Sequence, residues 1–338
     1  MPPDKPVTIE AKVRFLSSGA AFGEVAPITV AETHMAWVFL TGEYAFKLKK
    51  PVKYPFLDFS TIEARESACR EELRLNRRLA SSVYLDVLPL RRGASGGLAL
   101  NGDGEVVDWL VKMRRLPADR MLDALIEYNA VKTRDIRTIG ERLSRFYQTA
   151  TRTLLSPDEY LRIFIEEHSK NREILLQVDH NLPRGELDIA FSAIERMLSK
   201  HRPALELRAL QDRIIDGHGD LKPEHICLID PPAIIDCLEF NARLRMVDPF
   251  DELCYLGIEC ERQGAAWIGK QLIADLAASL DDYPPPEILA FYRVYRCSLR
   301  ARLSVAHLLE ANARTPEKWI PRARQYLAIA GAAAKDIA

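Results

Sequence analysis

The feature that most constrains the fold is a change of hydrophobic pattern near Pro117. Before it, the strongest local signals are short apolar runs typical of strands. After it, apolar residues recur at helical spacing in long segments. A strand-rich first third followed by a helix-rich remainder predicts an α+β chain of two lobes, residues 1–116 and 117–338, with a ligand-binding cleft between them.

The first third contains four predicted strands and one predicted helix. The strands are residues 28–32, 36–42, 44–50 and 106–113, and Thr41-Gly42-Glu43 is the expected turn of a hairpin. The sequence Ser60-Thr61-Ile62-Glu63 fits a capping box in which Ser60 and Glu63 satisfy each other's end of the first turn. It predicts a helix that ends at about Ala80.

The remainder is predicted to be mainly helical. A short β region, Arg213–Cys237, interrupts it with two apolar runs around the turn Asp230-Pro231-Pro232. The expected helices are Met121–Leu154, Pro157–Gln177, Glu186–Lys200, Pro249–Gln263, Glu287–Ala313 and Pro316–Ala330.

The composition narrows the class of partner. Forty-seven basic residues oppose 48 acidic ones among 338, so the net charge of -1 gives no general attraction to nucleic acid or an anionic membrane, and a small-molecule partner is expected. Six cysteines without a Cys-x-x-Cys pair predict packing residues in a reducing compartment. Without a signal-peptide pattern or an apolar run of about 18 residues, a cytoplasmic protein is expected.

The densest polar cluster lies between Ile214 and Phe240. Here His218, Asp220, His225 and Asp236 stand on or beside short apolar strands. A carboxylate in apolar surroundings is costly unless it binds a metal, a cation or hydrogen-bond donors. A divalent cation shared by Asp220 and Asp236, which straddle one hairpin, would remove that cost.

Four segments carry a resemblance to a known family. HGDLKPEH (218–225) resembles the catalytic loop of aminoglycoside and choline-type phosphotransferases, and IID (234–236) resembles their metal-binding strand end. DPFDEL (248–253) and YRVYRCSLRARL (292–303) resemble later helices of that family. The resemblance implies a protein-kinase-like fold with a small antiparallel sheet and one helix in the first lobe and a larger helical second lobe.

The resemblance also implies residue roles. Asp220 would orient or deprotonate the acceptor hydroxyl, and Asp236 would hold Mg²⁺ or Mn²⁺ on the phosphates of ATP. The strand of residues 44–50 would supply the phosphate-binding lysine, because Ala45-Phe46-Lys47 matches the family's Ala-x-Lys pattern. Lys47 is the first choice and Lys49 the reserve, although two such lysines also suit the solvent face of an alternating strand.

The carboxylate partner of this lysine is expected on the capped helix. Glu72 shares a helix face with Ala68 and Leu75, whereas Glu71 faces Arg74. Glu72 should therefore point inward and pair with Lys47.

The resemblance implies that the adenine of ATP lies near Met113 and Arg115. The sequence departs from the family's pattern at two positions. The family expects Asn, a second metal ligand, five residues after the catalytic Asp, but His225 stands there. An imidazole is a poorer Mg²⁺ ligand than an amide oxygen, so His225 would bind a softer ion, hydrogen-bond Asp220 or mark weakened catalysis. The expected phosphate loop contains no glycine, which leaves Thr33 and backbone N–H groups to bind phosphate.

Three functions remain open at this point. The first is an active kinase for a small hydroxyl compound; the second is a nucleotide-binding, weakly catalytic regulator; the third is a metal-dependent hydrolase built from His218, Asp220, His225 and Asp236. Asp248 and Asp251 are interpreted as structural caps. Arginines near the presumed site argue against a polycationic aminoglycoside as substrate: Arg243, Arg245, Arg293, Arg296, Arg300 and Arg302.

Overall fold

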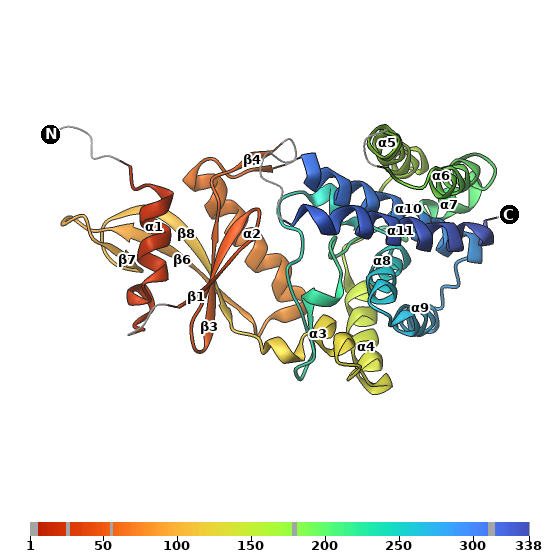
Figure 1. The fold of residues 1–338 in the computed structure, drawn as a ribbon. Coiled ribbons are helices and arrows are strands. Elements are labelled where there is room, and N and C mark those ends of the chain that lie inside the picture. Colours follow the sequence, from red (N-terminus) through yellow and green to blue (C-terminus); the bar gives the residue numbers. More distant parts are fainter. Residues whose placement is uncertain (1–5, 25–27, 55–56, 178–180, 310–314, 338) are drawn as a thin grey trace. The chain divides into compact units, whose positions relative to one another are not determined.

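The computed structural model describes residues 6–24, 28–54, 57–177, 181–309 and 315–337. The chain forms two compact units (Figure 1). The first comprises Met1–Met121 with His225–Arg243, and the second comprises Leu122–Glu224 with Leu244–Ala338. The lobe boundary after residue 116 stays a prediction, but the segment His225–Arg243 packs with the first unit, which the sequence did not indicate.

The first unit is built on a six-stranded antiparallel sheet with the strand order β1-β2-β3-β8-β6-β7. The strands predicted at 28–32, 36–42, 44–50 and 106–113 are confirmed. The strands are β1 (Thr29–Glu32), β2 (Ala36–Leu40), β3 (Tyr44–Lys49), β6 (Tyr84–Arg92), β7 (Leu98–Leu100) and β8 (Glu105–Arg114), and a separate pair is formed by β4 (Lys53–Tyr54) and β5 (Leu57–Asp58).

Alternation along β3 sends neighbouring side chains to opposite faces of this sheet. Phe46 and Leu48 join the core that also contains Leu16 of helix α1 (Ile9–Ser17), an element the sequence analysis did not predict. Ala45 joins the other core, together with Cys69 of helix α2 (Ile62–Ala80). Lys47 and Lys49 therefore lie on the face that α2 covers.

Helix α2 begins one residue later than the predicted capping box. Its N-cap is Thr61, whose hydroxyl accepts the N–H of Ala64 at 3.1 Å. The Ser60 hydroxyl instead donates to Asp58 at 2.5 Å, so it is not the cap. Two adjacent hydroxyl residues can both cap a helix, and the neighbouring aspartate decides between them here. The predicted end at Ala80 is confirmed.

The returning segment of the first unit contains a short hairpin, which confirms the predicted β region. Strand β10 (Ile226–Cys227) pairs with β11 (Ala233–Ile234). The side chains of Cys227 and Ala233 are buried in the core beneath α2. This packing fixes the residues that directly follow β11, among them Asp236.

The second unit is mainly helical, and α10 and α11 pack side by side in it (Figure 1). The helix predicted over Met121–Leu154 is divided at Asn129, whose φ of 51° is left-handed and cannot continue a helix. Two helices, α7 and α9, were not predicted. The helices are α3 (Leu122–Glu127), α4 (Thr133–Thr149), α5 (Pro157–Leu175), α6 (Arg184–Ser199), α7 (Arg202–Leu210), α8 (Pro249–Arg262), α9 (Ala266–Leu280), α10 (Pro286–Ala306) and α11 (Trp319–Ala333).

Two short strands in the second unit lead into and out of the polar loop. Strand β9 (Ile215–Asp216) pairs with β12 (Met246–Val247). Among the helices of the described ranges, none combines the length and apolar character needed to cross a membrane.

Candidate active site

The side chains of Lys47 and Lys49 on β3 lie on the face of the sheet that α2 covers. The Lys49 side chain is 1% exposed, and that of Lys47 is 16% exposed. Their position rules out the solvent-face interpretation of this strand, because a buried ammonium needs acidic partners.

Glu72 of α2 supplies the first of these partners. Its carboxylate is fully buried and lies 2.9 Å from the Lys47 ammonium and 2.6 Å from that of Lys49. Glu71 points away and pairs with Arg74 on the helix surface. The expected ion pair between Lys47 and Glu72 is present, and Lys49 shares it. A role of this pair in binding phosphate stays a prediction.

Asp236 is the second partner of Lys47. Its Oδ1 lies 2.7 Å from the Lys47 Nζ, and its Oδ2 lies 3.3 Å from Nε2 of His225. The side chain of Asp236 is 41% exposed, so this carboxylate is where the buried charges reach solvent. The structure thus brings together four predicted site residues, Lys47, Glu72, Asp236 and His225.

The backbone around Asp236 is held in an unusual conformation. Its φ is 61°, in the left-handed region that only a few residue types adopt readily. Its N–H donates to the Tyr84 hydroxyl at 3.2 Å, and the next N–H, of Cys237, donates to Oδ1 of Asn76 at 2.9 Å. Strand β6 and helix α2 thereby aim the carboxylate at Lys47.

Glu239 completes the group and was not identified from the sequence. Its Oε1 lies 2.5 Å from the Lys49 Nζ. Its position three residues after Asp236 was the sequence signal that could have identified it as a site residue. We call Lys47, Lys49, Glu72, Asp236 and Glu239 the lysine cluster; its three carboxylates exceed its two ammonium groups by one negative charge.

The ion pairs of the lysine cluster keep Lys47, Lys49 and Glu72 charged. Burial lowers the pKa of the two lysines, but their attraction to carboxylates outweighs it and raises both pKa values. The carboxylates are Asp236 and Glu72 for Lys47, and Glu239 and Glu72 for Lys49. Burial raises the pKa of Glu72, but the two lysines outweigh it and lower that pKa. Lys47, Lys49 and Glu72 are therefore ionised throughout the neutral range.

The predicted nucleotide contacts Thr33, Met113 and Arg115 lie in the same unit. The Thr33 hydroxyl exchanges hydrogen bonds with the backbone of Ala36 at the β1–β2 turn. The Met113 side chain is buried in the core under α2. The Arg115 guanidinium donates to the Thr41 carbonyl at 2.6 Å. Each side chain thus has a structural contact, and nucleotide binding by these residues stays a prediction.

Asp220 belongs to the second unit and is held by two side chains. The Tyr255 hydroxyl donates to its Oδ1 at 3.1 Å, and the Lys222 ammonium lies 3.0 Å from its Oδ2. Burial lowers the pKa of Lys222, but the attraction of Asp220 and Glu224 outweighs it and raises that pKa. Burial, and to a smaller extent the negative charge of Asp220, raises the pKa of Tyr255. Its hydroxyl therefore stays protonated and can donate a hydrogen bond.

Glu252 of α8 anchors the loop that carries Asp220. This buried carboxylate accepts the backbone N–H groups of His218 at 2.9 Å and Gly219 at 2.7 Å. The Tyr147 hydroxyl donates to its other oxygen at 2.9 Å. The Nδ1 of His218 accepts the Asp220 N–H at 3.3 Å and so braces the loop. The sequence did not assign this role to Glu252.

Of the two aspartates interpreted as caps, Asp248 is a cap, whereas Asp251 lies in the first turn of α8. Asp248 caps α8, accepts the Tyr292 hydroxyl at 3.0 Å and pairs with Arg208 at 2.6 Å. Arg208 also pairs with Asp282 at 2.7 Å. We call Arg208, Asp248, Asp282 and Tyr292 the arginine cluster. Asp251 pairs instead with Arg296 at 2.6 Å.

The arginines that argued against an aminoglycoside substrate are mostly bound to carboxylates. Each ion pair is internal to the second unit. The pairs are Arg245–Asp216, Arg293–Glu261, Arg296–Asp251, Arg300–Glu259 and Arg302–Glu167. Most of these arginines thus already have acidic partners, and the exclusion of an aminoglycoside substrate stays a prediction.

Within the parts of the chain that the structure describes, no group of three or more His, Cys, Asp and Glu side chains could hold a metal ion. A hydrolytic metal site uses three protein ligands and an open position. The hydrolase hypothesis stays a prediction.

Comparisons with known proteins place this chain among uncharacterised relatives in sequence. No protein-family model matches it. Uncharacterized protein Rv2004c of Mycobacterium tuberculosis and Uncharacterized protein Mb2027c of Mycobacterium bovis are each 34% identical to it over 283 residues, which are 82% of this chain and 54% of each relative. The chain spans about half the length of the curated relatives it matches.

Solved structures with a similar fold belong to small-molecule kinases. A choline/ethanolamine kinase family protein from Mesorhizobium loti gives a TM-score of 0.58 at 15% identity, over 98% of this chain and 99% of that one. A thermostable mutant of aminoglycoside phosphotransferase APH(4)-Ia, in ternary complex with AMP-PNP and hygromycin B, gives 0.54 at 11% identity, over 96% and 98%. The fold expected from the resemblance is thus confirmed: this chain has the protein-kinase-like fold of aminoglycoside phosphotransferases and choline/ethanolamine kinases.

Proposed function

We propose that this chain is a phosphotransferase that uses ATP with Mg²⁺ or Mn²⁺ to phosphorylate a hydroxyl group of a small molecule. The fold supports the class of enzyme, but a fold alone does not determine a function. The observation that carries the proposal is the position of the Lys47 ammonium, 2.9 Å from Glu72 and 2.7 Å from Asp236. Phosphoryl transfer requires such a fixed cation beside a carboxylate that can bind metal.

Asp236 is suited to act as a ligand of Mg²⁺. Mg²⁺ is commonly bound by one or two carboxylates together with substrate phosphates and water, so it does not need a closed protein cage. Asp236 is the half-exposed carboxylate of a cluster with an excess negative charge. His225, 3.3 Å from Oδ2 of Asp236, is proposed as a second ligand or as the group that orients that oxygen. ATP with its metal ion would supply the phosphoryl group.

Lys47 is proposed to bind the phosphates, and Glu72 to position it. Because Glu72 is shared with Lys49, and Lys49 is nearly inaccessible, Lys47 is the better candidate of the two lysines. Thr33, Met113 and Arg115 are proposed to lie beside the nucleotide. The N–H groups of Thr33 and Arg115 already donate to the carbonyls of Ala36 and Glu43, so contacts with the nucleotide would use other atoms of these residues.

Asp220 is proposed as the group that accepts or orients the acceptor hydroxyl. Its side chain is partly exposed, and the contacts from Tyr255 and Lys222 keep it oriented. A positioned carboxylate of this kind is the catalytic base expected in a kinase of this fold.

The proposal is tested by following ATP turnover with pooled sugars, amino alcohols, nucleosides and aminoglycosides. We expect turnover with one pool by the wild type, none by Asp220→Asn, and wild-type turnover by Asp188→Asn, which removes an exposed carboxylate on α6. Equal turnover by wild type and Asp220→Asn would remove Asp220 from the mechanism.

The weakly catalytic regulator remains the second candidate because His225 stands where the resemblance implies Asn. Saturable ATP binding without turnover on any pool would favour it. Restored turnover in His225→Asn would then show that this histidine limits catalysis.

A further inference from the structure

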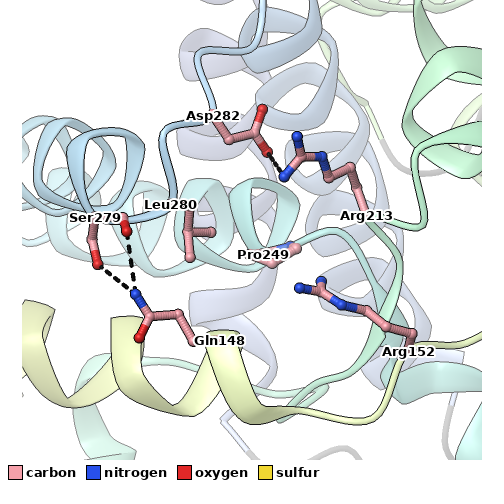
Figure 2. Close-up of a pocket in the computed structure, with 7 residues that line it drawn as sticks. All are labelled: Gln148, Arg152, Arg213, Pro249, Ser279, Leu280 and Asp282. Carbon is pink, nitrogen blue, oxygen red and sulfur yellow. Dashed lines mark hydrogen bonds and ion pairs between the residues drawn. The ribbon is translucent and has the colours of Figure 1, made fainter.

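A small cavity in the second unit lies among charged and polar side chains that have no part in the proposed reaction (Figure 2). Its volume is about 220 Å³, and its polar lining residues are Gln148, Arg152, Arg213, Ser279 and Asp282. This volume is several times the roughly 30 Å³ of one water molecule. It is below the roughly 300–1,000 Å³ typical of pockets for larger organic ligands. The cavity therefore suits a small ion.

Backbone pairing brings the two arginines of the cavity together. Arg152 forms an antiparallel bridge with Ile215, and the N–H of Thr153 donates to the Ile214 carbonyl at 2.9 Å. Arg213 lies two residues before Ile215 on the same paired segment. Figure 2 shows both guanidinium groups directed toward the cavity. Their convergence is thus built into the backbone.

The acidic residue of the cavity is already engaged elsewhere. Both oxygens of Asp282 accept hydrogen bonds from Arg208, at 2.7 and 2.9 Å, whereas the nearest nitrogen of Arg213 is 3.5 Å away. Arg208 also pairs with Asp248. Arg152, Arg208 and Arg213 are therefore opposed by only two carboxylates, those of Asp248 and Asp282. Among these five groups, one positive charge has no carboxylate partner.

Hydrogen-bonding capacity remains unused on both arginines of the cavity. The Nε of Arg213 is buried and has no hydrogen-bond partner. Arg152 forms no side-chain hydrogen bond or ion pair with any residue that the structure describes. Arg152 is exposed, so its donors can bind a ligand in place of water, and the buried Nε of Arg213 makes a negative charge beside it favourable.

Ser279 offers a neutral donor at the same cavity. The amide of Gln148 donates to both the hydroxyl and the carbonyl oxygen of Ser279, at 3.2 Å in each case. Because the Ser279 hydroxyl is the acceptor in this bond, its own hydrogen can be donated to a ligand. Two guanidinium groups and one hydroxyl form a set of donors for an oxyanion.

We propose that this cavity is a binding site for inorganic phosphate, with Arg152 and Arg213 as its ligands and Ser279 as an additional donor. Guanidinium groups match the oxygens of phosphate in pairs, and such charge-assisted bonds are stronger than neutral ones. The site does not depend on the proposed kinase activity.

Isothermal titration of the full chain with potassium phosphate, at constant ionic strength set with potassium chloride, tests this site. We expect saturable binding that is about tenfold weaker in Arg152→Gln and in Arg213→Gln, the loss of one charge-assisted hydrogen bond. Arg137→Gln, which removes an exposed arginine elsewhere on α4, should bind like the wild type.

Two results would overturn the proposal. One is the absence of saturable phosphate binding by the wild type; the other is equal weakening by Arg137→Gln and Arg152→Gln, which would indicate general charge attraction. Arg152 is exposed, so its substitution is expected to leave the fold intact, and matching thermal unfolding of this variant and the wild type checks that.

Discussion

The lysine cluster of the first unit and the arginine cluster of the second are both built from buried ion pairs, and in each the carboxylates outnumber the cations by one, yet they differ in exposure. Arg208, Asp248 and Asp282 are almost completely buried and are closed by a tyrosine hydroxyl. The lysine cluster instead ends at Asp236, whose side chain is 41% exposed. Sealed ion pairs can only stabilise or specify a fold, whereas an accessible carboxylate beside a fixed ammonium can also bind a ligand.

The largest effect on stability is expected in the arginine cluster. Arg208→Met leaves the buried Asp248 carboxylate without its cation and leaves Asp282 only the more distant Arg213, so it should lower the free energy of unfolding by roughly 3–5 kcal/mol. Urea unfolding measures this, and Arg202→Met, at an exposed arginine on the same helix, should change it little. Similar losses in the two variants would mean that the sealed cluster contributes no more than a surface pair.

A smaller loss is expected in the lysine cluster. Glu72→Gln retains the shape of the side chain but removes the charge that Lys47 and Lys49 share, so unfolding should cost roughly 1.5–3 kcal/mol less. The matched control is Glu71→Gln on the outer face of α2. If the two substitutions had equal effects in urea unfolding, the inward ion pair would not stabilise the unit.

The two units should also respond oppositely to pH. The lysines lower the pKa of Glu72 below 4.5, so its stabilisation is present above that pH and is lost as the pH falls through the folded-state pKa. Burial raises the pKa of Glu252, so the native state holds that proton more tightly and loses stability as the pH rises above 4.5.

Urea unfolding between about pH 4 and pH 7 measures this difference. The stability advantage of the wild type over Glu72→Gln should shrink toward low pH. Relative to Glu252→Gln, the stability of the wild type should instead fall as the pH rises. Parallel trends for the two variants would contradict the assigned pKa directions.

The smallest effect on stability is expected at the exposed end of the lysine cluster. Asp236→Asn removes one half-exposed charge, and Glu72 still neutralises Lys47, so the free energy of unfolding should change by about 1 kcal/mol or less. The same variant should lose ATP turnover. A large loss of stability would instead place Asp236 with the sealed, structural ion pairs.

Regular local patterns could be predicted from the sequence. Alternation placed Lys47 and Lys49 on one face of β3, and helical spacing distinguished Glu72 from Glu71. Strand β6 was missed because Pro89 interrupts its pattern, yet it pairs with β8 across nine residues of chain, Tyr84–Arg92. Propensity indicates local structure, and here the partner strand overrides it.

The parts of the site that depend on distant segments could not be predicted in this way. Asn76 and Tyr84 orient the backbone at Asp236 although they lie far from it in sequence. Glu239 is near Asp236 in sequence, but its pairing with Lys49 depends on how the returning segment packs under α2. Likewise, Glu252 anchors the loop of Asp220 only through tertiary contact.

Calorimetric titration of the chain with ATP, with and without Mg²⁺, tests the central claim most directly. The account predicts Mg²⁺-dependent, saturable binding that weakens at least about tenfold in Lys47→Met, as expected for the loss of a charged hydrogen bond, and is unchanged in Lys53→Met, at an exposed lysine of the same unit. No binding by the wild type, or equal binding by the two variants, would contradict it.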